Sequence, residues 1–589
     1  MRERRRAEVC LVALAALAAA MSIASSVPAG NPAQEWNALV DEYLGKVYFP
    51  QNPSTATVAG IHKYDSEIEG YSAERIAADN RVLHEYEKRV ASFPAAGLGQ
   101  LDAADREILL GHIRSELLTS EVLRPQEKNP DIYSSGAAGT VYVLMVRKFA
   151  PAEERLRDVI AREQKIPGIF TQARKNLKNP AKIYTEIAIE QIPGIIGFFE
   201  NDVPAAFAEV KDSALNAEFA KSNASAIAAL KTYGDWLKTD LLPRSRGDFR
   251  IGAENFSKKL KYEEMVDIPL NRLLQVGLDD LHKNQAELRR VAKEIDPGKT
   301  PQAVMAELWT MHPAPNQLME TFRGTFDSII AFIQETKIVT IPDGPKPRLM
   351  ETPPFERATT TASMDTPGPF EKVATESYFH VTLPGPHDSK SEVESLMSGF
   401  NIGTIFSTSV HETYPGHYLQ YLWTSRAPST LRKVFSANTN GEGWAHYGEQ
   451  MMFEEGYVRP GRGAKDEREV KLVHLGQLQD ALLRDARFVV GIQMHTGKMS
   501  FEEAKKFFVE EGFQTEKIAE IEAKRGTSDP TYLYYTLGKL QILKLREDYK
   551  KKMGASFSLG EFHDKFMSQG EPPIAIVRQA LLGDGSPTL

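Results

Sequence analysis

The stretch 410–442 brings together the residue types that bind a metal ion and activate water. His411 and Glu412 are adjacent, His417 follows six residues after His411, and Glu442 lies 25 residues after His417. Two neutral imidazoles and a carboxylate suit zinc, which in catalytic sites takes three protein ligands and leaves a fourth position for water. The carboxylate beside the first histidine, Glu412, is then the candidate general base acting on that water. The pattern predicts a zinc-dependent hydrolase, and among hydrolases it favours a peptidase.

The spacing of the two histidines requires a break in the helix that carries them. In the common His-Glu-x-x-His pattern the histidines are four residues apart and face one metal ion. Six residues turn a side chain by about 240° and move it by about 9 Å along an ideal helix, so an unbroken helix cannot present His411 and His417 to one ion. Pro415 and Gly416 lie between them, and proline disrupts helical hydrogen bonds. We therefore expect the backbone to break at 415–416; the alternative is a solvent-facing His-Glu pair followed by an ordinary turn.

The third ligand has two candidates on one helical face. Glu442 begins the segment Glu-Gly-Trp-Ala-His-Tyr-Gly-Glu, and Glu449 ends it. We prefer Glu442, because a carboxylate at the start of a buried helix face needs a reason to be there. Glu449 and His446 are then predicted to support the ligands as hydrogen-bonding partners that hold them in place.

Three further residues are candidates for contacts with a substrate. His495 ends a predicted helix that also contains Arg487. His495 would assist the oxyanion or, like Arg487, bind a substrate carboxylate. A histidine at the C-terminal end of a helix can equally be a capping residue. His380, on a predicted strand that precedes the histidine helix, is the third candidate.

These residues also carry a resemblance to a known family. His-Glu-x-x-Pro-Gly-His followed by Glu-Gly-Trp-Ala-x-Tyr resembles the bacterial domain-of-unknown-function 885 family, DUF885. The resemblance extends over nearly the whole chain after residue 29 and includes segments 129–133, 250–252, 494–497 and 537–541. More distantly, the stretch is similar to gluzincin peptidases such as angiotensin-converting enzyme and the carboxypeptidase Taq family. It departs from them by two extra residues between the histidines.

This resemblance implies the ligands and the base named above, inside a large helical shell around a deep central channel that admits short peptides. Peptidases similar to converting enzyme also place two tyrosines near the metal. By that similarity Tyr535 would stabilise the oxyanion and Tyr532 would contact the substrate. The alternative is that both tyrosines belong to the core, with their hydroxyls at its rim.

Composition and charge exclude several classes of partner. The chain has 589 residues, of which 42% are hydrophobic and 25% charged, and its net charge is −8; these proportions are ordinary for a globular protein. No run of Lys and Arg occurs beyond the first few residues, so nucleic acid is not expected as a partner. No later apolar run reaches the roughly 18 residues of a spanning helix, so no integral membrane segment is expected after signal cleavage.

The N-terminus predicts export. Four arginines within 2–6 precede an apolar run at 9–21, and small residues follow up to residue 30. A charged region, an apolar region of about 7–15 residues and a small-residue exit describe a secretory signal peptide, here 1–29. The expected location is therefore secreted or periplasmic, and a membrane anchor is the alternative. Cys10 is the one cysteine of the sequence, so a metal site in the cleaved protein must use histidine and carboxylate.

Helical periodicity dominates the chain. Ser500 and Glu503 form a capping box that opens a helix. Residues 337–386 differ, because 338–341 and 378–382 are rich in β-branched and aromatic residues and prolines cluster between these two runs. We predict a mainly α protein in which 30–589 forms a single helical domain, in one or two lobes, with a β-rich insert at about 337–386 beside the histidine helix. Predicted helices include 151–165, 183–200, 202–239, 262–295, 534–551 and a final helix at 559–567.

Two other functions fit the same residues. A zinc amidase or esterase would use the same ligands, and only its substrates or the shape of its pocket would separate it from a peptidase. A non-catalytic protein would capture peptides in the same channel. Such a binder has no use for a carboxylate beside the metal, so Glu412 argues against it.

Overall fold

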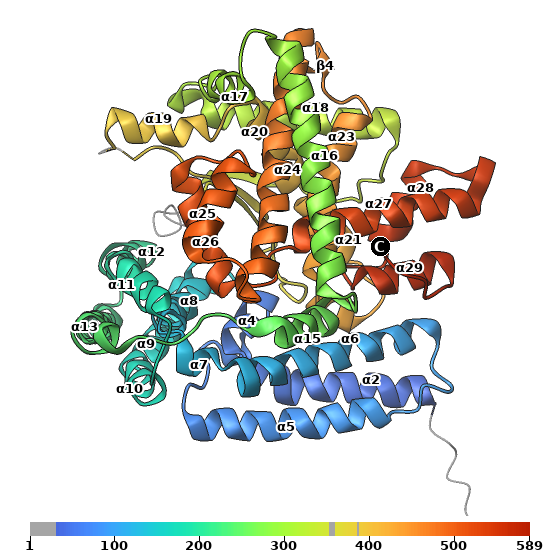
Figure 1. Ribbon diagram of the computed structural model, residues 1–589. Coiled ribbons are helices and arrows are strands. Elements are labelled where there is room, and N and C mark those ends of the chain that lie inside the picture. The colour runs from blue at the N-terminus through green and yellow to red at the C-terminus, as the bar shows by residue number, and fades with distance from the viewer. Residues whose placement is uncertain (1–30, 353–359, 386–387) are drawn as a thin grey trace, which may run out of the picture.

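The computed structural model describes residues 31–352, 360–385 and 388–589, which form a mainly helical protein (Figure 1). The mainly α prediction is confirmed, because the described strands make only a three-stranded and a two-stranded sheet. The predicted signal peptide, 1–29, lies outside the described residues. Within those residues, no helix combines the length and the apolar character needed to cross a bilayer.

The N-terminal helices α2, α5 and α6 lie along one edge of the molecule (blue in Figure 1). Their apolar faces bury Trp36, Tyr86 and Leu109 in one cluster, as expected for amphipathic helices. A buried ion pair of 2.7 Å between Asp105 of α6 and Arg432 of α22 (Thr430–Val434) joins this layer to the C-terminal half. The helices of this part are α2 (Pro32–Tyr43), α3 (Phe49–Gln51), α4 (Pro53–Ala59), α5 (Ala73–Ser92) and α6 (Gln100–Leu117).

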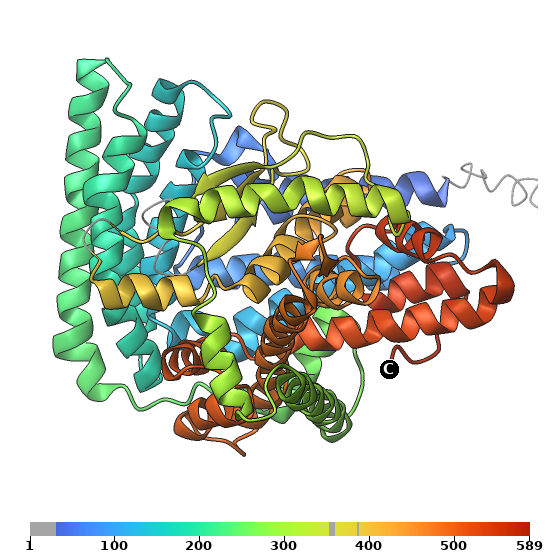
Figure 2. The ribbon, with the colours of Figure 1, turned by 90° about the horizontal axis from the view of Figure 1, so that it is seen from above.

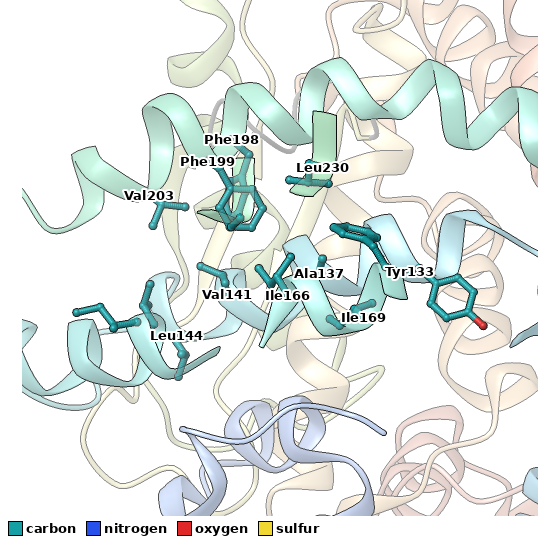
Figure 3. Close-up of a cluster of buried hydrophobic side chains, with 14 of the residues drawn as sticks. Tyr133, Ala137, Val141, Leu144, Ile166, Ile169, Phe198, Phe199, Val203 and Leu230 are labelled. Atoms are coloured by element: carbon teal, nitrogen blue, oxygen red, sulfur yellow. The ribbon is translucent and has the colours of Figure 1, made fainter. Parts of the chain in front are cut away.

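A bundle formed by residues 125–244 contains its own hydrophobic core (teal in Figures 1 and 2). Figure 3 shows Val141, Ile166, Phe199 and Leu230 converging from different helices in this core, and all four side chains are fully buried. Its helices are α7 (Pro125–Lys128), α8 (Asp131–Met145), α9 (Ala152–Glu163), α10 (Ile166–Asn176), α11 (Lys182–Gly197), α12 (Val203–Ala206), α13 (Ser213–Trp236) and α14 (Leu242–Arg244).

Two long helices, α16 and α24, run side by side through the C-terminal half (Figures 1 and 2). Buried leucines such as Leu281 and Leu482 fill the space around them. Helix α20 packs against α24, and α23 packs against α27. The helices here are α15 (Gly252–Glu264), α16 (Leu270–Ile295), α17 (Pro301–Trp309), α18 (Leu318–Thr336), α19 (Lys390–Ser398), α20 (Ile402–Glu412), α21 (His417–Thr424), α23 (Asn438–Glu454), α24 (Glu467–His495), α25 (Phe501–Glu510), α26 (Glu516–Ser528), α27 (Tyr534–Met553), α28 (Leu559–Met567) and α29 (Ile574–Leu582).

A small sheet lies beside the histidine helix, as predicted. Strand β3 (Tyr378–Val381) is central; it pairs in parallel with β1 (Arg348–Glu351) and antiparallel with β2 (Ala362–Asp365). Helix α18 lies across the sheet (Figure 2), and the rings of Phe322 and Phe379 are 5.3 Å apart between centroids. Strand β2, at the edge, contacts α20. The second sheet consists of β4 (Arg459–Pro460) and β5 (Gly463–Ala464).

Several predictions about elements are wrong. The predicted helix 202–239 is divided, since α12 ends at Ala206 and α13 begins at Ser213. Residues 338–341 do not form a strand; Ile338 and Val339 are buried in the core. The Ile338 carbonyl accepts a hydrogen bond of 2.6 Å from His563 of α28, so these β-branched residues fill a core position instead of pairing in a sheet. Helix α28 is not the last helix, because α29 follows it. Short π- or 3-10-helical segments complete the chain: η1 (Leu44–Tyr48), η2 (His62–Tyr64), η3 (Leu118–Leu123), η4 (Phe198–Asp202), η5 (Leu237–Leu241), η6 (Pro315–Gln317) and η7 (Gly554–Ser556).

Candidate metal centre

The helix that carries His411 ends where the sequence predicts a break. Helix α20 ends at Glu412, and α21 begins at His417. The four residues between them include the cis peptide bond Tyr414–Pro415. The break turns the two imidazoles toward each other, with ring centroids 4.7 Å apart and ring planes at 86°. The predicted break is confirmed.

Glycine is needed at the turn because the backbone passes very close to the preceding helix. The Gly416 N–H donates a hydrogen bond of 3.0 Å to the Val410 carbonyl. A Cβ at position 416 would lie 1.8 Å from the His411 carbonyl oxygen, far inside any permitted contact. The Pro415 carbonyl accepts a hydrogen bond of 2.7 Å from the Trp444 indole. This bond fixes the turn against α23, the helix that carries the acidic residues.

His411, His417 and Glu442 bring their ligand atoms within 4.8 Å of one another. The Glu442 Oε2 atom is 3.3 Å from His411 Nε2 and 3.4 Å from His417 Nε2. Two atoms bound to one tetrahedral zinc ion at about 2.0–2.1 Å are separated by about 3.3–3.4 Å. The spacing of these donor atoms therefore fits zinc.

The carboxylate oxygen at the centre of this group lacks a hydrogen bond. Glu442 Oε2 is buried and has no hydrogen-bond partner among the described residues, although two imidazoles lie near it. A buried polar atom without a partner is costly, more so when it is charged. Burial acts to raise the pKa of Glu442, but His417 and His411 outweigh it and hold that pKa well below its usual value. A cation bound by all three residues would satisfy the oxygen.

Glu449 supports His411 from the side opposite the metal position. The His411 Nδ1–H donates a hydrogen bond of 2.7 Å to Glu449 Oε1, which leaves Nε2 available as a ligand. Glu449 is fully buried, and it also contacts Arg484 at 3.1 Å and His446 Nδ1 at 3.4 Å. Burial lowers the pKa of His411, but the nearby carboxylates of Glu442 and Glu449 raise it to about 10 overall. The structure thus places Glu442 beside both imidazoles and Glu449 and His446 on the other side of His411.

Glu412 ends α20, directly after His411, and is half-buried. Burial raises its pKa, while His411, His417 and the backbone amide of Met364 in β2 act to lower it. A carboxyl group whose pKa is raised toward neutrality is suited to accept and return a proton.

Tyr535, in the first turn of α27, lies near Glu442. Burial and then the charge of Glu442 raise its pKa. Arg525 donates a hydrogen bond of 3.4 Å to the Tyr535 oxygen, and the Arg487 guanidinium lies 4.9 Å from the ring centroid. Because its oxygen accepts from Arg525, the phenol retains its own O–H as a donor. Helix α27 approaches α23 closely, since a Cβ at Gly443 would lie 2.5 Å from the Gly538 Cα.

The other predicted contact residues are all buried within the fold. Tyr532 is fully buried in a hydrophobic cluster, where a substrate has no access to it. His495 is also buried and donates through Nε2 to the Gly526 carbonyl at 2.7 Å; it lies about 16 Å along α24 from Arg484. Arg487 is engaged by Glu522 through two hydrogen bonds of 2.7 Å. His380 is buried on β3.

The site also includes residues that the sequence did not single out. A cavity of about 480 Å³ reaches His417 and is lined by Glu571, Thr424 and Met364. Arg525 and Tyr534 neighbour Tyr535, and the Tyr534 hydroxyl donates to Asp529 at 3.0 Å. Glu571 lies between two C-terminal helices and has no spacing relation to the His-Glu motif that would have revealed it. The tyrosine cluster was visible in the sequence, but the sequence did not show that Tyr532 is fully buried and that Tyr535 lies near Glu442.

Comparison with known proteins identifies the family. Residues 53–581 match the family described as "Bacterial protein of unknown function (DUF885)". A solved structure from Shewanella oneidensis, described as "a putative lipoprotein of unknown function", is 25% identical with a TM-score of 0.78, and the match covers 94% of this chain and 100% of that one. The "putative lipoprotein from Colwellia psychrerythraea" is 19% identical with a TM-score of 0.78, covers 93% of this chain and 98% of its own, and shows the shared fold. No curated protein matches the chain. The protein belongs to the DUF885 family of bacterial proteins.

Proposed function

We propose that this protein is an exported zinc-dependent hydrolase that cleaves peptide bonds in short peptides, with His411, His417 and Glu442 as zinc ligands. The observation that carries the proposal is the Oε2 atom of Glu442. It is buried, lacks a hydrogen bond within the described part of the chain, and lies 3.3 and 3.4 Å from two imidazole nitrogens. A distant similarity to gluzincin peptidases, based on the His-Glu motif, supports the same assignment.

The side chains around this group can each contribute to hydrolysis. Bound zinc would supply a Lewis acid that activates water and a scissile carbonyl. Glu412, with its raised pKa, accepts the proton of the attacking water and returns it to the leaving amine. The Tyr535 hydroxyl donates to the carbonyl oxygen as negative charge develops there, and Arg525 holds that hydroxyl in position.

Two alternatives use the same ligands. A zinc amidase or esterase would share the base and the phenol donor, so substrate profiling separates it from a peptidase. A peptide-binding protein without activity would retain the cavity at His417 but gain nothing from Glu412. The half-buried carboxylate of Glu412 directly beside a ligand therefore favours catalysis.

Export is part of the proposal. The arginines and the apolar run of residues 2–21 have the composition of a signal peptide. The description of the Shewanella oneidensis neighbour as a lipoprotein supports the same location. Fractionation of cells that express the full chain, followed by mass spectrometry of the mature N-terminus, tests this.

The substitution Glu412→Gln tests the proposed catalytic role. It removes the base and leaves the three ligands, so we expect zinc content to be retained while peptide cleavage falls by about 10²- to 10⁴-fold. Cleavage of a peptide mixture is followed by mass spectrometry with and without a chelator. Glu455→Gln, at an exposed carboxylate after α23, is the control. Unchanged cleavage by the Glu412→Gln variant would refute the assignment of the base.

A further inference from the structure

The cavity of about 480 Å³ beside the metal ligands contains an acidic group that the proposed mechanism does not use. Its wall includes His417, Gln420 and Thr424 from α21, and Met364 from strand β2. Glu571, from the segment between α28 and α29, lines the same cavity. One face of the cavity is thus shared with the metal site, because His417 belongs to both.

The position of Glu571 is fixed by contacts to elements of the metal site. Its backbone carbonyl accepts a hydrogen bond of 2.8 Å from Ala437 N–H, at the start of α23. Its Oε1 atom accepts a hydrogen bond of 2.9 Å from the Thr424 hydroxyl. A Cβ at Gly441, the residue before Glu442, would lie 3.3 Å from Glu571 Oε2. The carboxylate is therefore held close to the ligand-bearing turn of α23.

No lysine or arginine forms an ion pair with Glu571 in the described part of the chain. Its carboxylate accepts one side-chain hydrogen bond, from Thr424, and forms no ion pair there. Of the two cations that line the cavity, Arg432 is buried and paired with Asp105 at 2.7 Å. The other, Lys433, is half-buried and forms no ion pair with Glu571. His417, on the same wall, offsets part of the charge of Glu571. A half-buried carboxylate without an ion-pair partner gains further from a ligand that supplies a positive charge.

We propose that Glu571 is the acidic end of a subsite that binds an ammonium group of the substrate, next to the scissile bond. The inference rests on the proposed hydrolase function, because it assigns this cavity to the substrate of that site. The ammonium group is either the free α-amine of a peptide or the side-chain amine of a lysine. A substrate carboxylate would be repelled at this position.

A set of four short peptides separates the two sources of the ammonium group. The peptides carry a free or an acetylated α-amine, each combined with lysine or its uncharged isostere norleucine at one position. For the wild type we expect kcat/KM to be higher for one of the two charged groups. The Glu571→Gln variant keeps the side-chain shape and an acceptor for Thr424 but removes the charge. It should lower the charged-to-uncharged ratio of kcat/KM by about 10- to 100-fold, because a hydrogen bond to a charged group is lost.

Two controls keep the result specific to this carboxylate. Glu561→Gln changes an exposed carboxylate on α28 that pairs with Lys565, and it should leave the ratio as in the wild type. Thermal unfolding of the Glu571→Gln variant shows whether it folds. A folded variant in which all four peptides change by the same factor, or none changes, would overturn the subsite.

Binding separates a failure of this inference from a failure of the proposed function. Dissociation constants of the four peptides are measured by calorimetry with the Glu412→Gln protein and with the Glu412→Gln, Glu571→Gln double variant. A charge preference that disappears only in the double variant supports the subsite, even where no peptide is cleaved by the wild type. Cleavage with no charge preference in either assay supports the hydrolase and rejects the subsite.

Discussion

Glu449 is the buried carboxylate on which the orientation of His411 depends, and the substitution Glu449→Gln tests that dependence. The wild-type carboxylate accepts a hydrogen bond of 2.7 Å from His411 Nδ1 and pairs with Arg484 at 3.1 Å. Glutamine preserves the shape but removes the charge, and its amide nitrogen is a donor. If that nitrogen faces His411 or Arg484, two N–H donors point at each other and no hydrogen bond forms. The metal ligand then loses the contact that fixes its ring.

Two effects of different size follow from this geometry. Loss of a partner that orients a metal-binding histidine costs about 10- to 100-fold in metal affinity, which is about 1.4–2.7 kcal/mol of zinc-binding free energy. Arg484, whose side chain is 13% exposed, loses its main counter-charge. Breaking a fully buried pair costs about 3–5 kcal/mol in the free energy of unfolding, which is the upper limit for this half-buried arginine. Asp480, at 3.9 Å from Arg484, offsets part of the second cost.

The zinc affinity of Glu449→Gln is measured by competition with a chromophoric chelator, and the stability of the metal-free protein by urea unfolding. Glu454→Gln, at an exposed position of the same helix, is the matched control. We expect the control to match the wild type in both measurements. A Glu449→Gln variant with wild-type zinc affinity would refute the assigned support of His411, whatever its stability.

Two further predictions concern the backbone turn and a buried acid. Gly416→Ala should lower the free energy of unfolding by about 3 kcal/mol or more and weaken zinc binding, because its Cβ overlaps the His411 carbonyl. Gly139→Ala is the control: it lies in α8, and no atom lies within 4 Å of the new Cβ. This variant should be as stable as the wild type or more stable by about 0.5–1 kcal/mol. Equal unfolding free energies for the two variants would contradict the close contact between position 416 and the His411 carbonyl. Burial, opposed by hydrogen bonds from Ser222 and Asn223, raises the pKa of Glu163 from 4.5 to about 7. Between pH 4.5 and about 7 the unfolded chain has lost this proton and the folded protein still holds it. The free energy of unfolding should therefore fall by about 3 kcal/mol as the pH rises through this window. Urea unfolding of Glu163→Gln at several pH values should no longer show this fall, and a variant with the same pH dependence as the wild type would refute the role of Glu163.

The metal group was predictable because its signal is local. His411 and His417 lie on either side of Pro415-Gly416. Because an ideal α-helix has 3.6 residues per turn, two side chains six residues apart cannot face one ion unless the helix breaks between them. Glu442 follows 25 residues after His417, and it was preferred over Glu449 because it lies at the start of its helix. The mainly α fold was predictable for a similar reason, since periodic apolar residues mark long helices.

The remaining site residues depend on contacts between distant segments. Glu571 lies beside the candidate metal site because its backbone carbonyl accepts a hydrogen bond from the Ala437 N–H. No local sequence pattern predicts a contact between segments so far apart in the chain. Tyr532 and Tyr535 are three residues apart, yet one is fully buried and the other neighbours Glu442. The packing of α27 on α23 decides which of the two tyrosines lies near Glu442, and this packing cannot be predicted from a single sequence. Residues 338–341 show the same limit: burial against α28 selects the residue types that a strand would also use.

The metal content of the purified protein tests the central claim most directly. After loading with zinc and removal of the excess, elemental analysis should find one zinc ion per wild-type chain, and cleavage of peptides should depend on it. The variants His411→Ala, His417→Ala and Glu442→Ala should each lose that ion while remaining folded by circular dichroism. A wild-type chain that retains no zinc, or ligand variants that retain it fully, would contradict the account.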